Sequence, residues 1–129
     1  MPEFISFPPY DRYGISTFVL HAGLVHISHF GATSDGEGKP LDDIETQATA
    51  TFFRLQAELR KIGLDLSDVL KITVMLRDIE DFKTMHSVWQ RFFPAPAPAR
   101  TTITTRFVSQ QCRIQIDGLA AMRTHATAP

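Results

Sequence analysis

The sequence has a single cysteine, Cys112, and no hydrophobic run that approaches the length of a membrane-spanning helix. Such a helix needs about 20 consecutive apolar residues, so we expect no membrane contact. One cysteine cannot form a disulfide within the chain, and so few cysteines are typical of a reducing compartment. The first ten residues also lack a charged segment followed by an apolar one, so we expect no signal peptide and a cytoplasmic location. We interpret Cys112 as a small buried side chain rather than a nucleophile.

An excess of one charge is also missing. The 13 basic and 14 acidic residues leave a formal net charge of −1, and the basic residues are scattered along the chain. Nucleic-acid-binding surfaces usually show clustered lysine and arginine. The charge pattern therefore argues against nucleic acid as a partner.

Known motifs for metals, phosphates and serine nucleophiles are missing as well. The glycine-containing segment 31–38 has neither the lysine of a phosphate-binding loop nor a dinucleotide fingerprint, and no GxSxG sequence occurs. The histidines show no HxH or HxxxH spacing and form no cluster with cysteine, so we predict no metal site. They are His21, His26, His29, His86 and His125.

What is present predicts one α+β domain that spans residues 1–129. A chain of this length with 43% hydrophobic residues can bury a core. Asp42 with Glu45 three residues later fits a capping box, and Gly63 fits a helix stop. Apolar residues at spacings of three and four predict helices over Asp43–Ile62 and Asp81–Phe93.

Alternating residues predict the strands. In Val69–Arg77, the side chains of Leu70, Ile72, Val74 and Leu76 share one face. Alternating prolines after the second helix predict a stiff, extended segment that leads into Arg100. The C-terminal segment Thr124–Pro129 has no pattern, and we expect it to fray. The other predicted strands are Phe4–Phe7, a hairpin of Ser16–His21 and Leu24–Ser28 around Ala22-Gly23, Arg100–Phe107, and Cys112–Asp117.

Two helices with one apolar stripe each can cover only one face of this sheet. The other face mixes Thr, Lys, Arg, Gln and Asp with Met and Val, which is typical of a face half-buried against another subunit. We therefore predict a homo-oligomer with polar clefts where the subunits meet.

Arg100 and Asp117 are the candidate functional pair. Arg100 opens one predicted strand and Asp117 closes the next, so both would lie at the mouth of one cleft if the sheet brings those ends together. Arginine offers a rigid bidentate fork that suits a carboxylate ligand. The alternative is a structural ion pair or two solvated strand ends.

Three stretches resemble the Rid family of YjgF-like reactive imine and enamine deaminases. They are DVLKITVMLRDIEDFKTMHSVWQRFF at Asp68–Phe93, PAR at Pro98–Arg100 and IQIDGLA at Ile114–Ala120. The resemblance implies a chorismate-mutase-like fold with two helices on one face of the sheet. It also implies a homotrimer whose sheets form a central barrel, with a ligand cleft at each subunit interface.

The resemblance also implies an activity, the hydrolysis of small 2-imino or enamine acids to 2-keto acids and ammonia. Arg100 matches the arginine that holds the substrate carboxylate, and Asp117 matches an acid that positions water. Ser28 falls where the family often has serine, and backbone groups near Ser28 and Ile103 would line the pocket. We expect no cofactor, because an imine is already electrophilic.

Several positions depart from the family pattern. His29 replaces a usual glycine, Phe30 a common glutamine, and His86 a frequent asparagine. Asp117 is one methylene shorter than the usual glutamate, and the tyrosine expected near the start has no match, because Tyr13 and Phe18 are both displaced. His29 and Phe30 would narrow or reshape the pocket, so a different imine substrate or a non-catalytic, ligand-binding or chaperone-like trimer are alternatives. Endoribonuclease activity, attached to some relatives, is a third hypothesis, against which the scattered basic residues argue.

Overall fold

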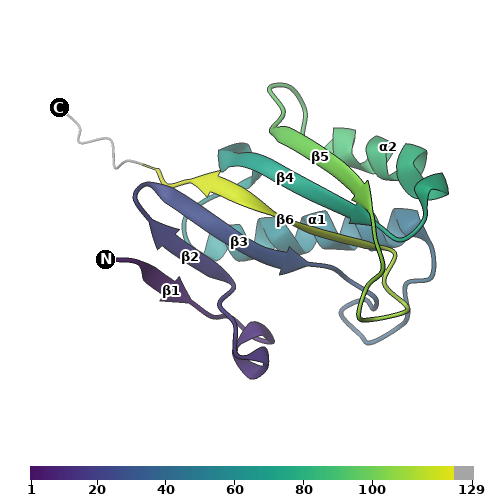
Figure 1. Ribbon diagram of the computed structural model, residues 1–129, viewed down its shortest axis with the longest axis horizontal. Helices are drawn as coiled ribbons and strands as arrows, with labels where there is room; N and C mark the ends of the chain where they lie inside the picture. The colour runs from purple at the N-terminus through teal and green to yellow at the C-terminus, as the bar shows by residue number, and fades with distance from the viewer. Residues whose placement is uncertain (124–129) are drawn as a thin grey trace.

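In a computed structural model, which describes residues 1–123, six strands form one sheet in the order β1-β2-β3-β6-β4-β5 (Figure 1). Neighbouring strands run antiparallel except β4 and β5, which are parallel because α2 connects them. The strands are β1 (Glu3–Ile5), β2 (Phe18–His21), β3 (Leu24–Phe30), β4 (Val69–Leu76), β5 (Ala99–Thr104) and β6 (Ile114–Ala121).

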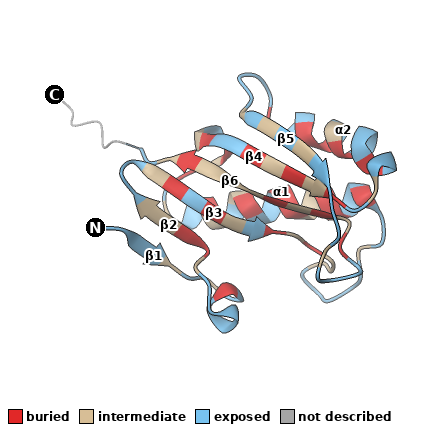
Figure 2. Ribbon diagram, viewed as in Figure 1, coloured by how far each residue is buried: buried red, intermediate tan, exposed pale blue. Residues whose placement is uncertain are grey.

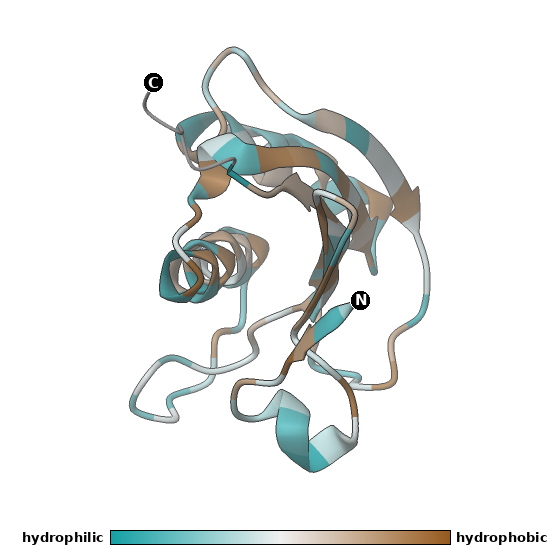
Figure 3. Ribbon diagram, turned by 90° about the vertical axis from the view of Figure 1, so that its left-hand side faces the viewer, coloured by the Kyte–Doolittle hydropathy of each residue, from teal (hydrophilic) through white to brown (hydrophobic). Residues whose placement is uncertain are grey.

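Two α-helices, α1 (Ile44–Lys61) and α2 (Phe82–Phe92), lie side by side on one face of the sheet (Figures 1 and 3). Short 3₁₀ helices occur at η1 (Tyr10–Tyr13), η2 (Leu66–Asp68) and η3 (Ile79–Asp81). The core lies between the helices and the sheet, and its fully buried members include Phe52, Leu55, Ile72, Met85 and Ile116. The predicted α+β fold with two helices on one face is confirmed.

The opposite face of the sheet has no helix over it within residues 1–123 (Figures 2 and 3). Thr73 and Met75 of β4 and Asp117 of β6 are half-buried there, and Lys71 is exposed. This face has the mixed composition that the sequence predicts. None of the helices in this part of the chain is long and apolar enough to cross a membrane.

The hairpin predicted around Ala22-Gly23 is confirmed between β2 and β3. Its two turn residues have φ angles of 53° and 80°. Positive φ at both central residues is the geometry that matches the right-handed twist of the flanking strands. The predicted edge strand near the N-terminus is also confirmed, as β1 pairs with β2.

The helix α1 begins one residue later than the capping pattern predicts. Asp43, not Asp42, is the N-cap, and its carboxylate accepts a hydrogen bond from the backbone N–H of Thr46 at 2.7 Å. Asp43 has the extended backbone of an N-cap, so Thr46 rather than Glu45 occupies the third helical position. At the other end, Gly63 has a φ of 79°, which confirms the predicted stop.

Two predictions of buried apolar residues are wrong. Leu70 is 47% exposed, because the register shifts between Val69 and Lys71 and puts Val69 into the core instead. The helical spacing puts Phe82 on one apolar stripe with Met85, Trp89 and Phe92, which predicts core packing. Phe82 is instead 38% exposed at the first position of α2, and it stacks on His86.

The chain between α2 and β5 is not the straight polyproline segment that the sequence predicts, because it bends at Ala95 and Pro96. The strand β5 then ends at Thr104 rather than Phe107, and β6 begins two residues after Cys112. The prediction for Thr124–Pro129 lies outside the described residues.

Candidate functional site

The side chain of Arg100 lies against α2 on the helix-covered side of the sheet. Arg100 is the second residue of β5 and stands opposite Ile72 of β4, whose side chain is fully buried under the helices. Its guanidinium carbon lies 4.8 Å from the centre of the Trp89 ring and 5.6 Å from that of Phe82. Arg100 Nη1 lies 3.1 Å from His86 Nδ1. The guanidinium thus has two aromatic contacts and one hydrogen bond that fix its position.

The helix α2 supplies all three partners from one side. Phe82, His86 and Trp89 follow at spacings of four and three, which places them on adjacent turns of one face. The rings of Phe82 and His86 are stacked at 5.9 Å with planes 7° apart. The helical spacing places Phe82 and Trp89 on the apolar stripe of α2. Trp89 is buried in the core at 5% exposure and Phe82 is 38% exposed, and both rings contact Arg100.

Arg100 makes no ion pair with a carboxylate within residues 1–123. Partial burial lowers the pKa of Arg100 from its usual value, yet a guanidinium stays charged in proteins. A half-buried cation without a counter-charge favours the binding of an external anion. Within residues 1–123, Arg100 therefore does not form the structural ion pair with Asp117 that the sequence left open.

A cavity of about 540 Å³ lies beside this cluster, at the free edge of the sheet. Ile103, 45% exposed, and Thr102 line it from β5, and Phe82 lines it from α2. Ile103 therefore lies beside a cavity, and its part in a substrate pocket stays a prediction.

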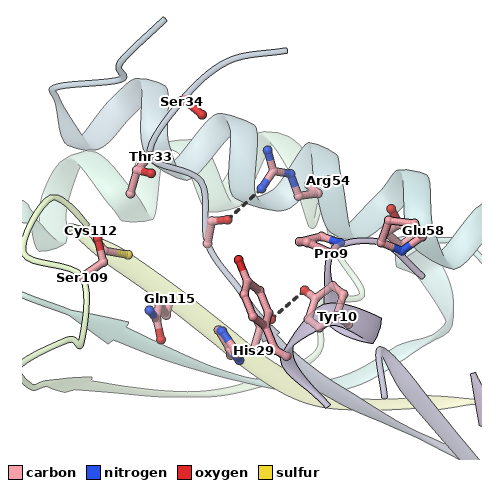
Figure 4. Close-up of a pocket in the computed structure, with 13 residues that line it drawn as sticks. Pro9, Tyr10, His29, Thr33, Ser34, Arg54, Glu58, Ser109, Cys112 and Gln115 are labelled. Atoms are coloured by element: carbon pink, nitrogen blue, oxygen red, sulfur yellow. Dashed lines mark hydrogen bonds between the residues drawn. The ribbon is translucent and has the colours of Figure 1, made fainter. Parts of the chain in front are cut away.

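A second cavity of about 540 Å³ opens between η1, the start of the loop after β3, α1 and β6 (Figure 4). Tyr10 donates its hydroxyl hydrogen to the carbonyl oxygen of His29 at 2.7 Å, and burial raises the pKa of the Tyr10 hydroxyl. Arg54 of α1 donates to the carbonyl oxygen of Gly31 at 3.1 Å. These two hydrogen bonds fix the backbone at His29 and Gly31, from which the His29 side chain extends into the cavity.

Gln115 and Cys112 line the same cavity from the β6 side (Figure 4). Cys112 is 2% exposed, its Sγ donates to the carbonyl oxygen of Ile114 at 3.0 Å, and burial raises the pKa of the thiol. A raised pKa disfavours the nucleophilic thiolate. The interpretation of Cys112 as a buried side chain is confirmed.

The segment Ser28–Phe30 forms a β-bulge at the end of β3. Ile27 stands opposite Gly118 and Phe30 opposite Ile116, so Ser28 and His29 together face Asp117. The Ser28 hydroxyl is used by a hydrogen bond to the carbonyl oxygen of Ser16. The structure therefore brings Ser28, His29 and Asp117 to one place.

The sequence predicted that the Phe30 side chain would narrow the pocket, but this side chain lies in the core. It is 1% exposed and packs in the core against Phe18 and Tyr10, with ring centres 6.2 and 5.4 Å away. The bulge provides the reason, because one extra residue turns the next side chain to the other face.

Arg100 and Asp117 do not meet at one cleft of the single chain. The strand β4 separates β5 from β6, Arg100 stands opposite Ile72, and Asp117 stands opposite Thr73. Successive strand residues point to opposite faces, so the two side chains lie on different sides of the sheet. Asp117 is half-buried and has no hydrogen-bond or ion-pair partner for its carboxylate among residues 1–123.

Sequence reasoning missed several residues of the His29 cavity, namely Tyr10, Arg54 and Gln115. They come from segments far apart in the chain and follow no motif, so only the fold assembles them. The alternation of side chains along the last strand did place Gln115 on the same face as Asp117, and this was the one sequence feature that could have indicated Gln115 as a site residue. No group of three His, Cys, Asp or Glu side chains in residues 1–123 is placed to hold a metal ion.

Comparisons with known proteins place these features in context. A family model described as Endoribonuclease L-PSP matches residues 7–122. The chain is 33% identical over 81 residues to Reactive Intermediate Deaminase A, chloroplastic, of Arabidopsis thaliana, which covers 63% of this chain but only 43% of the plant protein. It is 28% identical over 89 residues to 2-iminobutanoate/2-iminopropanoate deaminase of Salmonella typhimurium, covering 67% and 70% of the two chains. A YjgF-family structure from Neisseria meningitidis has the same fold, with a TM-score of 0.82, 22% identity, and coverage of 96% and 97%.

Proposed function

Because the chain belongs to the Endoribonuclease L-PSP family, in agreement with its resemblance to Rid and YjgF-like proteins, we propose that it hydrolyses small 2-imino or enamine acids to 2-keto acids and ammonia. Relatives named as deaminases support this proposal. The observation that carries it is the half-buried Arg100, held by aromatic rings and His86 and free of any acidic partner in the described residues.

In the proposed reaction Arg100 binds the substrate carboxylate through two parallel hydrogen bonds and thereby orients the neighbouring C=N carbon. Asp117 accepts a proton from a water molecule as the water oxygen bonds to that carbon and the π electrons move to nitrogen. That proton then passes to nitrogen and gives a carbinolamine, which carries a hydroxyl and an amino group on the same carbon. Asp117 next takes the hydroxyl proton and returns it to the amino nitrogen, so that the C–N bond breaks and ammonia leaves as the keto group forms. An enamine first takes a proton on carbon to become the imine. No oxidant or cofactor is needed for this balance.

The proposal includes a homotrimer, because the two parts of the site are separated within one chain. Arg100 and Ile103 lie at the free edge of β5, whereas Ser28, His29 and Asp117 gather around the bulge at the end of β3. A neighbouring copy that places its bulge against this edge would complete a cleft at each interface. The mixed open face of the sheet, half-buried at Thr73 and Asp117, supports such packing.

The test is ammonia release from imino acids that an amino-acid oxidase generates in the assay, measured for wild type, Arg100→Lys and Arg100→Ala. Lysine keeps the charge but loses the planar fork, so one charge-assisted hydrogen bond is lost. Such bonds contribute about 1.5–3 kcal/mol, so kcat/KM should fall roughly 10- to 150-fold. The kcat/KM of Arg100→Ala should fall further, because the substrate carboxylate then has no counter-charge. Arg106→Ala is the matched control, because Arg106 is an exposed arginine in the loop between β5 and β6.

Equal activity in wild type and both Arg100 variants contradicts the carboxylate clamp. Activity lost together with a collapsed melting temperature assigns Arg100 a structural role instead. Thermal melting of each variant therefore accompanies the kinetics.

RNA cleavage is the second candidate, because the matching family carries the description endoribonuclease. The net charge of −1 and the scattered basic residues argue against it. Salt-sensitive RNA cleavage that survives Arg100→Ala, with no ammonia release by wild type, would favour this candidate. Binding of a keto acid without any turnover would favour the ligand-binding alternative.

A further inference from the structure

We propose that His86 is a positioning residue that holds Arg100 in the orientation needed for a carboxylate, and that protonation of His86 releases Arg100. The role of Arg100 as the clamp rests on the proposed function. The contact between the two side chains does not, because it is a property of the fold.

The hydrogen bond between the two residues determines the tautomer of His86. Arg100 Nη1 lies 3.1 Å from His86 Nδ1. A guanidinium has only donors, so Nδ1 must accept with its lone pair and the ring hydrogen must be on Nε2. The observed arrangement therefore requires a neutral imidazole at position 86.

Aromatic contacts hold both partners of this bond. Phe82 stacks on His86 with ring planes 7° apart, and Trp89 lies under the guanidinium at 4.8 Å. Trp89 is 5% exposed, so it is a fixed base for the cluster. With both planes restrained, the Nη1–Nδ1 bond sets the direction in which the remaining N–H groups of Arg100 point.

Protonation of His86 would break this arrangement for two reasons. An imidazolium donates from both nitrogens, so it cannot accept from Arg100, and it places a second positive charge beside the first. Arg100 is the charged group in contact with the ring from β5. Lys83, one turn earlier on α2, and Glu80 on η3 are charged groups that line the neighbouring cavity. Release of Arg100 therefore follows protonation of His86, and a series of pH values tests it.

The first experiment compares wild type with His86→Asn and His86→Phe between pH 5.5 and 8. Asparagine keeps an acceptor oxygen near the Nδ1 position but does not titrate, and phenylalanine keeps the stacked ring without an acceptor. The probe is 2-oxobutanoate, a keto-acid product, with its Kd followed through the fluorescence of Trp89, the one tryptophan of the chain.

For wild type we expect the Kd to rise about tenfold or more from pH 8 to pH 5.5, as one hydrogen bond to a charged group is lost. His86→Asn should bind as tightly as wild type at pH 8 and stay tight at pH 5.5. His86→Phe should bind weakly at every pH. In turnover assays the same changes should appear in KM more than in kcat. If the Kd of His86→Asn rises at low pH as the Kd of wild type does, the proposal is wrong.

The second experiment needs no ligand and no activity. The fluorescence of Trp89 should change with pH in wild type as Arg100 leaves the ring, and the change should be absent in His86→Asn. Circular dichroism of each variant shows that it is folded. If this transition depends on His86 while wild type releases no ammonia from any imino acid, the deaminase proposal fails and the His86–Arg100 contact stands. If the transition persists in His86→Asn, the positioning role of His86 fails whatever the activity.

Discussion

At the scale of single residues, the contacts of Arg100 decide between two interpretations of one arginine. Its neighbours are the rings of Trp89 and Phe82 and the Nδ1 atom of His86, not a carboxylate. Stacking on a ring keeps the edges of a guanidinium free for bidentate binding. An arginine that serves only the fold would be expected to pair with an acid, as Arg113 does with the buried Asp81 at 3.0 Å.

Asp117 is the matching residue on the other side of the sheet, and its amide variant separates chemistry from binding. Asp117→Asn keeps the shape of the side chain but cannot take a proton. We expect kcat for imine hydrolysis to fall about 10²–10⁴-fold, the usual loss for a general base, with little change in keto-acid Kd. Steady-state kinetics and the Trp89 binding assay give the two numbers.

Gln115 is the control for this prediction, since it lies two residues earlier on the same face and lines the His29 cavity. Gln115→Ala should reduce kcat by less than Asp117→Asn, because an amide has no proton-accepting role to lose. If Gln115→Ala reduces kcat more than Asp117→Asn does, the attacking water binds in the His29 cavity and Asp117 has only a structural role.

At the scale of elements, β6 holds the sheet together because it pairs with both β3 and β4. Gly118 of β6 stands opposite Ile72 of β4, and a Cβ atom at Gly118 would overlap the carbonyl oxygen of Lys71. The overlap involves backbone, so a side chain cannot move aside to relieve it. Glycine at this position is required by close approach and not by its φ angle.

We therefore expect Gly118→Ala to lower the free energy of unfolding by about 1–3 kcal/mol, the usual range for overpacking. Gly36→Ala is the matched control, because nothing lies within 4 Å of a Cβ atom built there and its φ is not positive. Urea denaturation of both variants gives the difference. Equal stability of the two variants would show that β4 can move away from β6 without cost.

At the scale of the whole molecule, the two parts of the proposed site lie at different places on one chain. The free edge of β5 carries Arg100 and Ile103. The strand β4 separates this edge from Asp117 on β6 and from the β3 bulge beyond it. A monomer would leave the clamp and the proton acceptor on opposite faces of the sheet. The proposed activity therefore depends on assembly.

Light scattering after size exclusion should give a mass of three times the 14.5 kDa chain at micromolar concentration. Ile103→Glu, on the open face at the free edge, should lower this mass and abolish ammonia release together, because a charge would be buried at the interface. Thr84→Glu on the exposed side of α2 should change neither. A wild-type monomer that releases ammonia would refute both the trimer and the shared site.

Local sequence patterns were enough to predict the elements of this fold and its family. Period-two and helical spacings located β4, β6, α1 and α2 to within a few residues. Each segment must bury one face, and the spacing of its apolar residues shows which face that is. Turn residues such as Gly23 and Gly63 marked where the chain reverses, since few other residues adopt a positive φ. The PAR and IQIDGLA stretches identified the family on the same local basis.

Only the tertiary structure decided which functional side chains meet. Strand order is a long-range property, so the sequence could not show that β4 lies between β5 and β6 and puts Arg100 and Asp117 on opposite faces. Bulges likewise follow from pairing between distant strands, and they buried Phe30 and exposed Leu70 against their local pattern. The contact of His86 with Arg100 has the same origin, because parallel pairing of β4 and β5 is what carries Arg100 back to α2.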